Sequence, residues 1–264
     1  MSLPDLALQI VYGRLAWALV AAAMLLAILP AVFSKITGMS KIAKLSTPST
    51  AAYGMDGVDG ADRARRATVI VVTALVILMA LPGAASPAYW LTLVFQYPSG
   101  LLVGFSVVSL VARWHGRSAR FAMPAGLALA LAAAGLVLYL DAFGLLALGW
   151  YAAGFGAGFA PLLACAAACA SAFAIVRGHA PNTAAAVLIG VLPYSLLRLP
   201  SGNLWDALLD PLLWSWALGS VVVAAVRQRS ARKAAQLSPH AAPTPATTPL
   251  PEPALAHAAA NEQI

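Results

Sequence analysis

Charged residues are scarce in this chain. Asp, Glu, Lys and Arg make up 9% of its 264 residues, whereas apolar residues make up 61%. A soluble domain carries about 25% charged residues, so this chain has too few to cover a surface that faces water. We therefore exclude an ordinary soluble protein and predict an all-α integral membrane protein, a polytopic helical bundle whose main partner is the lipid bilayer.

Motifs that mark enzymes and coupled transporters are also missing. The sequence has no Walker-type glycine loop, no HExxH and no GxSxG. No Asp, Glu, Lys or His lies in the middle of an apolar run. Proton-coupled carriers usually need such a group, because they must change charge within the membrane. These absences favour a protein without catalytic activity and without a cofactor.

Cysteine is limited to Cys165 and Cys169, which lie within one apolar run. They cannot form a disulfide framework between loops, so they say nothing about the redox compartment. Their spacing places both on one helix face. A zinc site needs about four ligands, and no His or acid lies in a span to complete one. We interpret the two cysteines as packing residues and expect no metal site.

The apolar runs predict about seven transmembrane helices, with a range of six to eight. Runs of about 17–25 residues are typical of such helices. The runs cover residues 15–33, 67–84, 98–113, 121–140, 155–176, 183–198 and 211–226. A single helix over 142–176 would be about 50 Å long, which exceeds a hydrocarbon core of about 30 Å. Residues 142–154 are therefore expected to lie at the interface, to dip in and return, or to extend a tilted span.

The distribution of Lys and Arg predicts the direction of these spans. Fourteen of the sixteen basic residues lie on one side if the loops alternate, and only Arg14 and Arg198 lie on the other. The positive-inside rule then places the N-terminus outside and the C-terminus in the cytoplasm of a bacterial-type inner membrane. We attribute the net charge of +7 to this orientation and expect no nucleic-acid binding. A cleaved signal peptide over 15–29 is the alternative, but it would leave the following lysines outside.

Two segments are expected to lie outside the membrane domain formed by residues 1–233. Residues 34–66 are predicted to form a cytoplasmic loop. Residues 234–264 are rich in Pro and Ala and are predicted to form a disordered cytoplasmic tail. Within the loop, Asp56, Asp59 and Asp62 are spaced three apart, which can suit a divalent metal, although a glycine-rich linker explains them more simply.

Small residues gather between Gly149 and Val176 and suggest a helix-packing face. Gly154 and Gly158 form a GxxxG pattern, which lets transmembrane helices approach closely. The complete predicted face consists of Gly154, Gly158, Ala164, Cys165, Ala168 and Cys169. We expect other spans, or another membrane protein in a hetero- or homo-oligomer, to pack against it.

A polar cluster on the predicted outer side is the second candidate site. It consists of Asp141, Arg198, Asp206 and Asp210. Asp206 and Asp210 are four residues apart, and two carboxylates on one helix face can act as general acid and base. The surrounding sequence NLWDALLD also fits a short interfacial helix whose wet side carries both carboxylates without any catalytic role.

Three functions are compatible with these features. The favoured interpretation is a non-catalytic membrane subunit or scaffold of a larger complex, which packs through small-residue helix faces. The alternative is a small permease or exporter for an apolar or weakly polar solute, suggested by prolines that interrupt the spans, such as Pro161 and Pro193. A membrane-embedded enzyme that modifies lipids, using the outer cluster or the Asp56 segment, is the second alternative.

Overall fold

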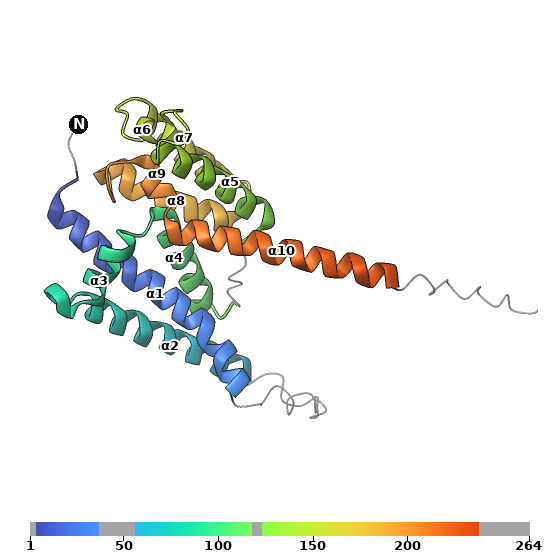
Figure 1. Ribbon diagram of the computed structural model, residues 1–264. Coiled ribbons are helices and arrows are strands. Elements are labelled where there is room, and N and C mark those ends of the chain that lie inside the picture. Colours follow the sequence, from blue (N-terminus) through green and yellow to red (C-terminus); the bar gives the residue numbers. More distant parts are fainter. Residues whose placement is uncertain (1–3, 37–55, 118–122, 238–264) are drawn as a thin grey trace, which may run out of the picture. The chain divides into compact units, whose positions relative to one another are not determined.

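The computed structural model describes residues 4–36, 56–117 and 123–237, and these residues contain helices but no β-strand. The chain divides into two units, Met1–Val222 and Val223–Ile264. Figure 1 labels the longer helices and colours them in chain order. This confirms the prediction of an all-helical chain for the described residues. Most of the predicted cytoplasmic loop and tail lies outside them.

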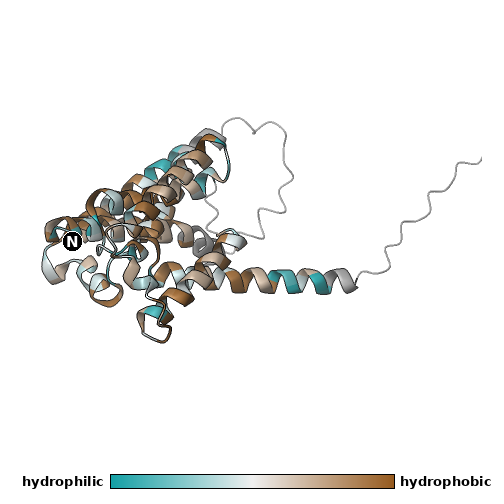
Figure 2. Cartoon of the chain, turned by 90° about the horizontal axis from the view of Figure 1, so that it is seen from above, coloured by the Kyte–Doolittle hydropathy of each residue, from teal (hydrophilic) through white to brown (hydrophobic). Residues whose placement is uncertain are grey.

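Seven helices of 15 or more residues occur in the described chain, and each overlaps one predicted apolar run. They are α1 (Leu6–Ile36), α2 (Asp56–Met79), α4 (Gly100–Trp114), α5 (Ala125–Ala142), α7 (Phe159–Val176), α8 (Pro181–Leu197) and α10 (Pro211–Leu237). The shorter elements are the 3-10 helix η1 (Gly83–Ala85), α3 (Pro87–Phe95), α6 (Trp150–Ala153) and α9 (Leu204–Leu208). Figure 2 shows hydrophobic residues along most of these helices.

Three of the helices are long and apolar enough to cross a membrane. They are α1 over Leu6–Ile28, α5 and α7, while α4 and α8 are apolar but shorter. Two boundaries differ from the sequence interpretation. The Asp56 segment, interpreted as a linker, forms the first turns of α2, and α10 continues to Leu237, beyond the predicted end of its span. Periodicity does not fix such boundaries, because a helix can continue past its apolar section.

Side-chain caps set the starts of several helices. Ser86 begins α3 and accepts a hydrogen bond from the amide of Ala88 (3.2 Å). Ser99 begins α4 in the same way, and Asn203 begins α9. The first amides of a helix have no carbonyl partner within it, so a side-chain oxygen at this position stabilises the start.

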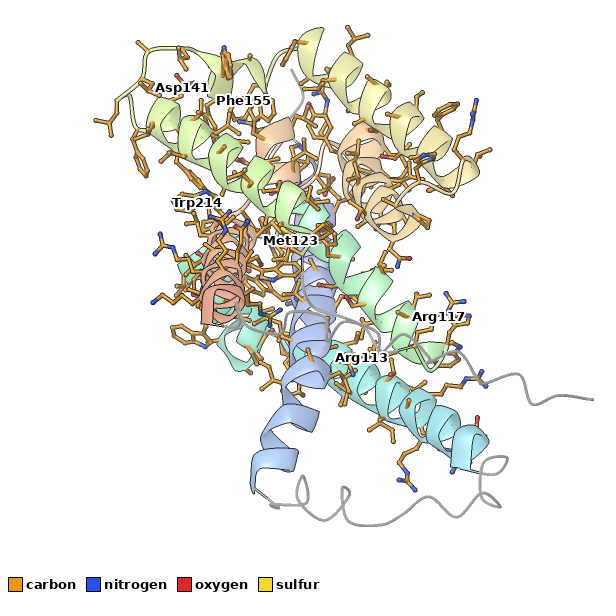
Figure 3. The ribbon with its side chains drawn as sticks, turned by 90° about the vertical axis from the view of Figure 1, so that its right-hand side faces the viewer. Arg113, Arg117, Met123, Asp141, Phe155 and Trp214 are labelled. Carbon is orange, nitrogen blue, oxygen red and sulfur yellow. The ribbon has the colours of Figure 1, made fainter. Side chains whose placement is uncertain are left out.

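Hydrogen bonds between distant segments define two ends of the first unit. At one end, the Tyr12 hydroxyl donates to the carbonyl oxygen of Pro98 (2.9 Å), and the Gln9 amide donates to that of Pro200 (2.9 Å). We call this the acidic end, because it carries Asp141 at the end of α5, Asp206 in α9 and Asp210 just before α10. Figure 3 shows Asp141 and Phe155 at the opposite end of the unit from Arg113 and Arg117.

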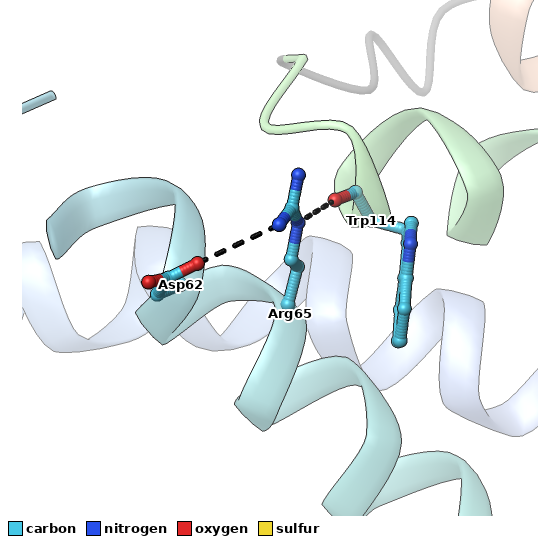
Figure 4. A network of polar contacts seen from close by, with 3 residues as sticks. All are labelled: Asp62, Arg65 and Trp114. Carbon is cyan, nitrogen blue, oxygen red and sulfur yellow. Dashed lines mark hydrogen bonds and ion pairs between the residues drawn. The ribbon is translucent and has the colours of Figure 1, made fainter. Parts of the chain in front are cut away.

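The opposite end, which we call the basic end, carries Arg65, Arg113 and Arg117. There the Nε of Arg65 donates to the carbonyl oxygen of Trp114 (3.0 Å), which ties α2 to the last residue of α4 (Figure 4). Arg65 also forms an ion pair with Asp62 (3.6 Å) one turn earlier in α2. Both partners are about half exposed, so we expect this pair to contribute little to stability.

The helices α4 and α8 pack backbone against backbone. A Cβ atom on Gly100 would overlap the carbonyl oxygen of Gly190, and one on Gly104 would overlap that of Ala186. Because Gly100 meets Gly190 and Gly104 meets Ala186, the two helices run antiparallel. Glycine at these positions allows an approach that any larger residue would prevent.

The main core lies around this helix pair. Side chains of α1, α4, α5, α8 and α10 meet in one cluster, which includes Val20, Leu101, Ala128, Ala186 and Leu213. The buried share of the candidate spans differs widely: 44% for α1, 22% for α5 and 17% for α7. The helix α1 is therefore an interior element of the first unit, whereas α5 and α7 expose most of their apolar surface.

Candidate functional site

Asp141, at the end of α5, holds the loop that leads to α6. Its carboxylate accepts hydrogen bonds from three backbone amides, those of Leu148 (2.8 Å), Gly149 (2.9 Å) and Tyr151 (2.8 Å). The last two belong to the start of α6, where a carboxylate satisfies amides that have no helical partner. The negatively charged Asp141 carboxylate therefore holds the loop between α5 and α6 in place through these three hydrogen bonds.

Asp206, in α9, is linked to the same segment through Tyr151. Its carboxylate accepts hydrogen bonds from the Tyr151 hydroxyl (3.2 Å) and from the Ser201 hydroxyl. Burial raises the pKa of the Asp206 carboxyl group, and the two hydrogen bonds oppose this rise. Burial also raises the pKa of the Tyr151 hydroxyl, and the nearby Asp206 carboxylate adds to it. Tyr151 thus connects Asp141 and Asp206 into one network.

Asn203 fixes the backbone beneath this network. It is fully buried, and its side-chain amide donates to the carbonyl oxygen of Tyr151 (3.3 Å). The amide of Leu204 donates to the carbonyl oxygen of Gly154 (3.1 Å), and a Cβ on Gly154 would overlap the Asn203 side-chain oxygen. Residues 150–154 are thereby docked onto the start of α9, and Gly154 is required for this contact.

Arg198, which follows α8, is directed to a tyrosine rather than to an aspartate. Its Nη1 donates to the hydroxyl of Tyr194 (2.7 Å), and its guanidinium lies 5.3 Å from the centre of that ring. Among the described residues, the structure contains one ion pair, between Asp62 and Arg65. Arg198 therefore belongs to the same end of the molecule as the aspartates without neutralising one of them.

Asp210 joins the starts of two helices. It is 5% exposed, and its carboxylate accepts hydrogen bonds from the amide of Leu213 in α10 (2.6 Å) and from the amide of Ser99. Ser99 in turn caps α4. Burial raises the pKa of the Asp210 carboxyl group, and the backbone hydrogen bonds oppose this. The positive ends of two helix dipoles also favour its negative charge.

The predicted acid–base pair is therefore divided between two separate sets of contacts. Asp206 faces Tyr151 and Ser201, whereas Asp210 faces Ser99 and Leu213. Within the described parts of the chain, no group of three or more His, Cys, Asp or Glu residues is arranged to hold a metal ion. The contacts of the acidic end hold loops and helix starts together.

The predicted small-residue face is also divided. Gly154 ends α6 and Gly158 precedes α7, so a break in the helix separates them, and the space around Gly158 is open. Of the remaining members, Ala164 is buried, Ala168 is half-buried, and Cys165 and Cys169 are exposed. The buried side of α7 instead consists of Ala160, Ala164 and Ser171.

The close contact between small residues of α4 and α8 was not identified from the sequence. Gly100 and Gly104 in α4, and Ala186 and Gly190 in α8, form the backbone contact between these helices. Both pairs have the small-x-x-x-small spacing. That spacing is visible in the sequence and could have identified the contact.

Known proteins provide no further guide to the site. A comparison with models of protein families, with curated proteins and with solved structures gives no match for this chain. The functional argument therefore depends on the residues and contacts described above.

Proposed function

We propose that the chain is a non-catalytic subunit of a larger membrane complex. It crosses a bacterial-type inner membrane seven times, with its N-terminus outside and its C-terminus in the cytoplasm. Its partner is another integral membrane protein, which packs a transmembrane helix against the exposed side of α7. The observation that carries this proposal is the composition of that side.

The middle of the exposed side of α7 is made of small residues, between the larger exposed side chains Phe159 and Leu162 on one side and Phe173 and Val176 on the other. Cys165, Ala166, Cys169 and Ala170 are all exposed, and their spacing places them on one side of the helix; we call them the α7 face. Only 17% of this candidate span is buried. Contact with lipid alone does not require small side chains, whereas close approach of a second helix does. The α7 face is therefore suited to a helix from a partner.

The acidic end supports a role without catalysis. A catalytic carboxylate must be able to reach its substrate. Asp141 instead accepts hydrogen bonds from three backbone amides, Asp206 from two hydroxyl groups, and Asp210 from amides at two helix starts. These bonds use the carboxylates to fix the fold.

Helix order and charge support the seven crossings. The seven long helices alternate in direction between the acidic end and the basic end, and positive charge gathers at cytoplasmic ends of membrane proteins. The helices α4 and α8, with 15 and 17 residues, are shorter than the roughly 20 that usually span a membrane. Their mutual packing supports them as short interior spans.

Purification in a mild detergent tests the proposal. We expect the wild-type chain to co-purify with a stoichiometric integral membrane partner. A crosslinker with one maleimide and one photoreactive group, attached to Cys165 or Cys169, should capture that partner. The double variant Ala166→Leu/Ala170→Leu should lose it, because the added side chains prevent close approach of a helix.

The matched control is Ala130→Leu/Ala134→Leu, which makes the same two changes, four residues apart, at exposed positions of α5. This variant should retain the partner. A chain that is isolated as a stable lone monomer would contradict the proposal. If such a monomer also moved a weakly polar solute across liposomes, the permease interpretation would replace it.

A further inference from the structure

A partly open cleft of about 250 Å³ lies between α1, η1 and α3. It is separate from the network around Tyr151 and from the α7 face. Its position is set by contacts at the acidic end, because Gly13 of α1 packs directly against the ring of Tyr97, and a Cβ on Gly13 would overlap that ring. The cleft therefore belongs to the folded first unit.

Among the residues that the structure describes, Arg14 is the only charged residue that lines this cleft. It is half-exposed, and among the described residues its one hydrogen bond is a long contact from Nη1 to the carbonyl oxygen of Ala80 (3.4 Å). A guanidinium has five N–H donors in a planar fork that matches phosphate oxygens. Arg14 therefore retains most of its donors for a ligand.

Besides the Ser86 hydroxyl, which donates to the carbonyl oxygen of Met79, three hydroxyl groups accompany this cation. They belong to the lining residues Tyr89, Thr92 and Tyr97, and none of them has a hydrogen-bond partner among the described residues. No carboxylate of the described part of the chain lines the cleft. A positive group among hydroxyl donors, without a competing anion, favours a ligand that carries an anionic oxygen group.

The edge of the cleft is apolar. Ile10 and Leu93 line it and are 41% and 62% exposed, and Trp90 and Val94 are exposed on the same short helix as Leu93. Sites for whole small molecules usually have volumes of about 300–1,000 Å³, so this cleft is too small for most of them. It suits a small polar group whose apolar body lies outside.

We propose that this cleft binds the phosphate group of an anionic phospholipid. The Arg14 guanidinium holds the phosphate oxygens, and the acyl chains lie along the exposed apolar surfaces of α1 and α3. Basic pockets between membrane helices bind lipid headgroups by this chemistry. The inference requires the geometry of the cleft and is independent of any protein partner at the α7 face.

Lipid binding to the full-length chain in detergent tests this proposal. After removal of native lipid, the chain is titrated with phosphatidylglycerol and with diacylglycerol of the same acyl chains, and bound lipid is counted by native mass spectrometry. We expect phosphatidylglycerol to bind about tenfold more tightly, because only it offers the charged phosphate. Arg14→Gln should remove this preference, and Arg117→Gln, a matched change at the basic end, should keep it.

Further measurements distinguish phospholipid binding from binding of a free anion and from a variant that fails to fold. Equal phosphatidylglycerol affinity in wild type and Arg14→Gln would overturn the proposal. If inorganic phosphate alone displaces the lipid at similar concentration, the site binds a free anion and the lipid assignment is wrong. Should Arg14→Gln fail to fold, Arg14→Lys keeps the charge and should keep part of the preference, while Thr92→Leu should fill the cleft and lose it.

Discussion

At the scale of single residues, the three carboxylates of the acidic end connect different parts of the structure. Asp141 closes a loop, Asp206 connects α9 to Tyr151, and Asp210 joins two helix starts. A buried carboxylate is tolerated where donors compensate for lost water. The hydrogen bonds therefore explain why a chain with so few charges retains Asp141, Asp206 and Asp210 at the acidic end.

Asp206 is expected to make the stability of the fold depend on pH. Burial raises its pKa above the ordinary value of 3.8, so the folded state binds the proton more tightly than the unfolded state. Its contribution to stability is complete below pH 3.8 and is lost as the pH rises through the folded pKa. The Asn side chain in Asp206→Asn cannot ionise, so this variant does not lose that contribution. Its stability relative to wild type should therefore increase as the pH rises through the folded pKa of Asp206.

Thermal unfolding in detergent between about pH 3 and pH 7 measures this difference. The melting temperature of Asp206→Asn relative to wild type should increase with pH, by about 2–4 °C for each kcal/mol gained. Asp62→Asn, the same substitution at an acid that is about half exposed, is the control for the effect of the substitution itself. A curve for Asp206→Asn that runs parallel to wild type would show that burial does not perturb this carboxyl group in the folded chain.

The partners of these residues could not be predicted from the sequence. The sequence grouped Asp141, Arg198, Asp206 and Asp210, and the structure places all four at one end of the unit, in or next to the ends of helices. Their contacts depend on how residues 150–154 dock onto α9, which requires a fully buried Asn203 and no side chain at Gly154. Neither hydropathy nor spacing contains that information.

At the scale of helices, two similar glycine patterns have different outcomes. Gly100 and Gly104 lie on one continuous helix and contact α8, whereas a break in the helix separates Gly154 from Gly158. The break lies between Gly154, the C-cap of α6, and Gly158, the N-cap of α7. Hydropathy is similar in both regions, so the sequence alone did not show which pattern lies on an uninterrupted helix.

The contact between α4 and α8 should be sensitive to a single added methyl group. In Gly104→Ala, the new Cβ would overlap the backbone oxygen of Ala186, which cannot move independently of its helix. We expect a loss of about 1–3 kcal/mol in the free energy of unfolding. Gly219→Ala in α10 is the control, because the space around Gly219 is open, and it should gain about 0.5–1 kcal/mol. Chemical unfolding in detergent measures both, and equal effects would contradict close packing at Gly104.

At the scale of the whole molecule, acidic and basic side chains are separated. Asp141, Asp206 and Asp210 lie at the acidic end, whereas Arg65, Arg113 and Arg117 lie at the basic end. The sequence could predict this separation, because Lys and Arg cluster between alternate apolar runs. It could not supply the interior position of α1 or the exposure of α5 and α7, since all three are similarly apolar and differ mainly in their buried share.

Reporter fusions test the resulting topology. The proposed seven crossings place the turn after α7 and the end of α10 on the cytoplasmic side, so fusions after Gly178 and after Lys233 should both give a cytoplasmic signal. A fusion at Gly202, between α8 and α9, should give an outside signal. If α6 and α7 formed two crossings instead of one, the Gly178 and Lys233 fusions would both report outside. That result would place Arg177 and the basic residues of α10 on the wrong side of the membrane, and it would overturn both the count of seven and the assignment of the acidic end to the outer face.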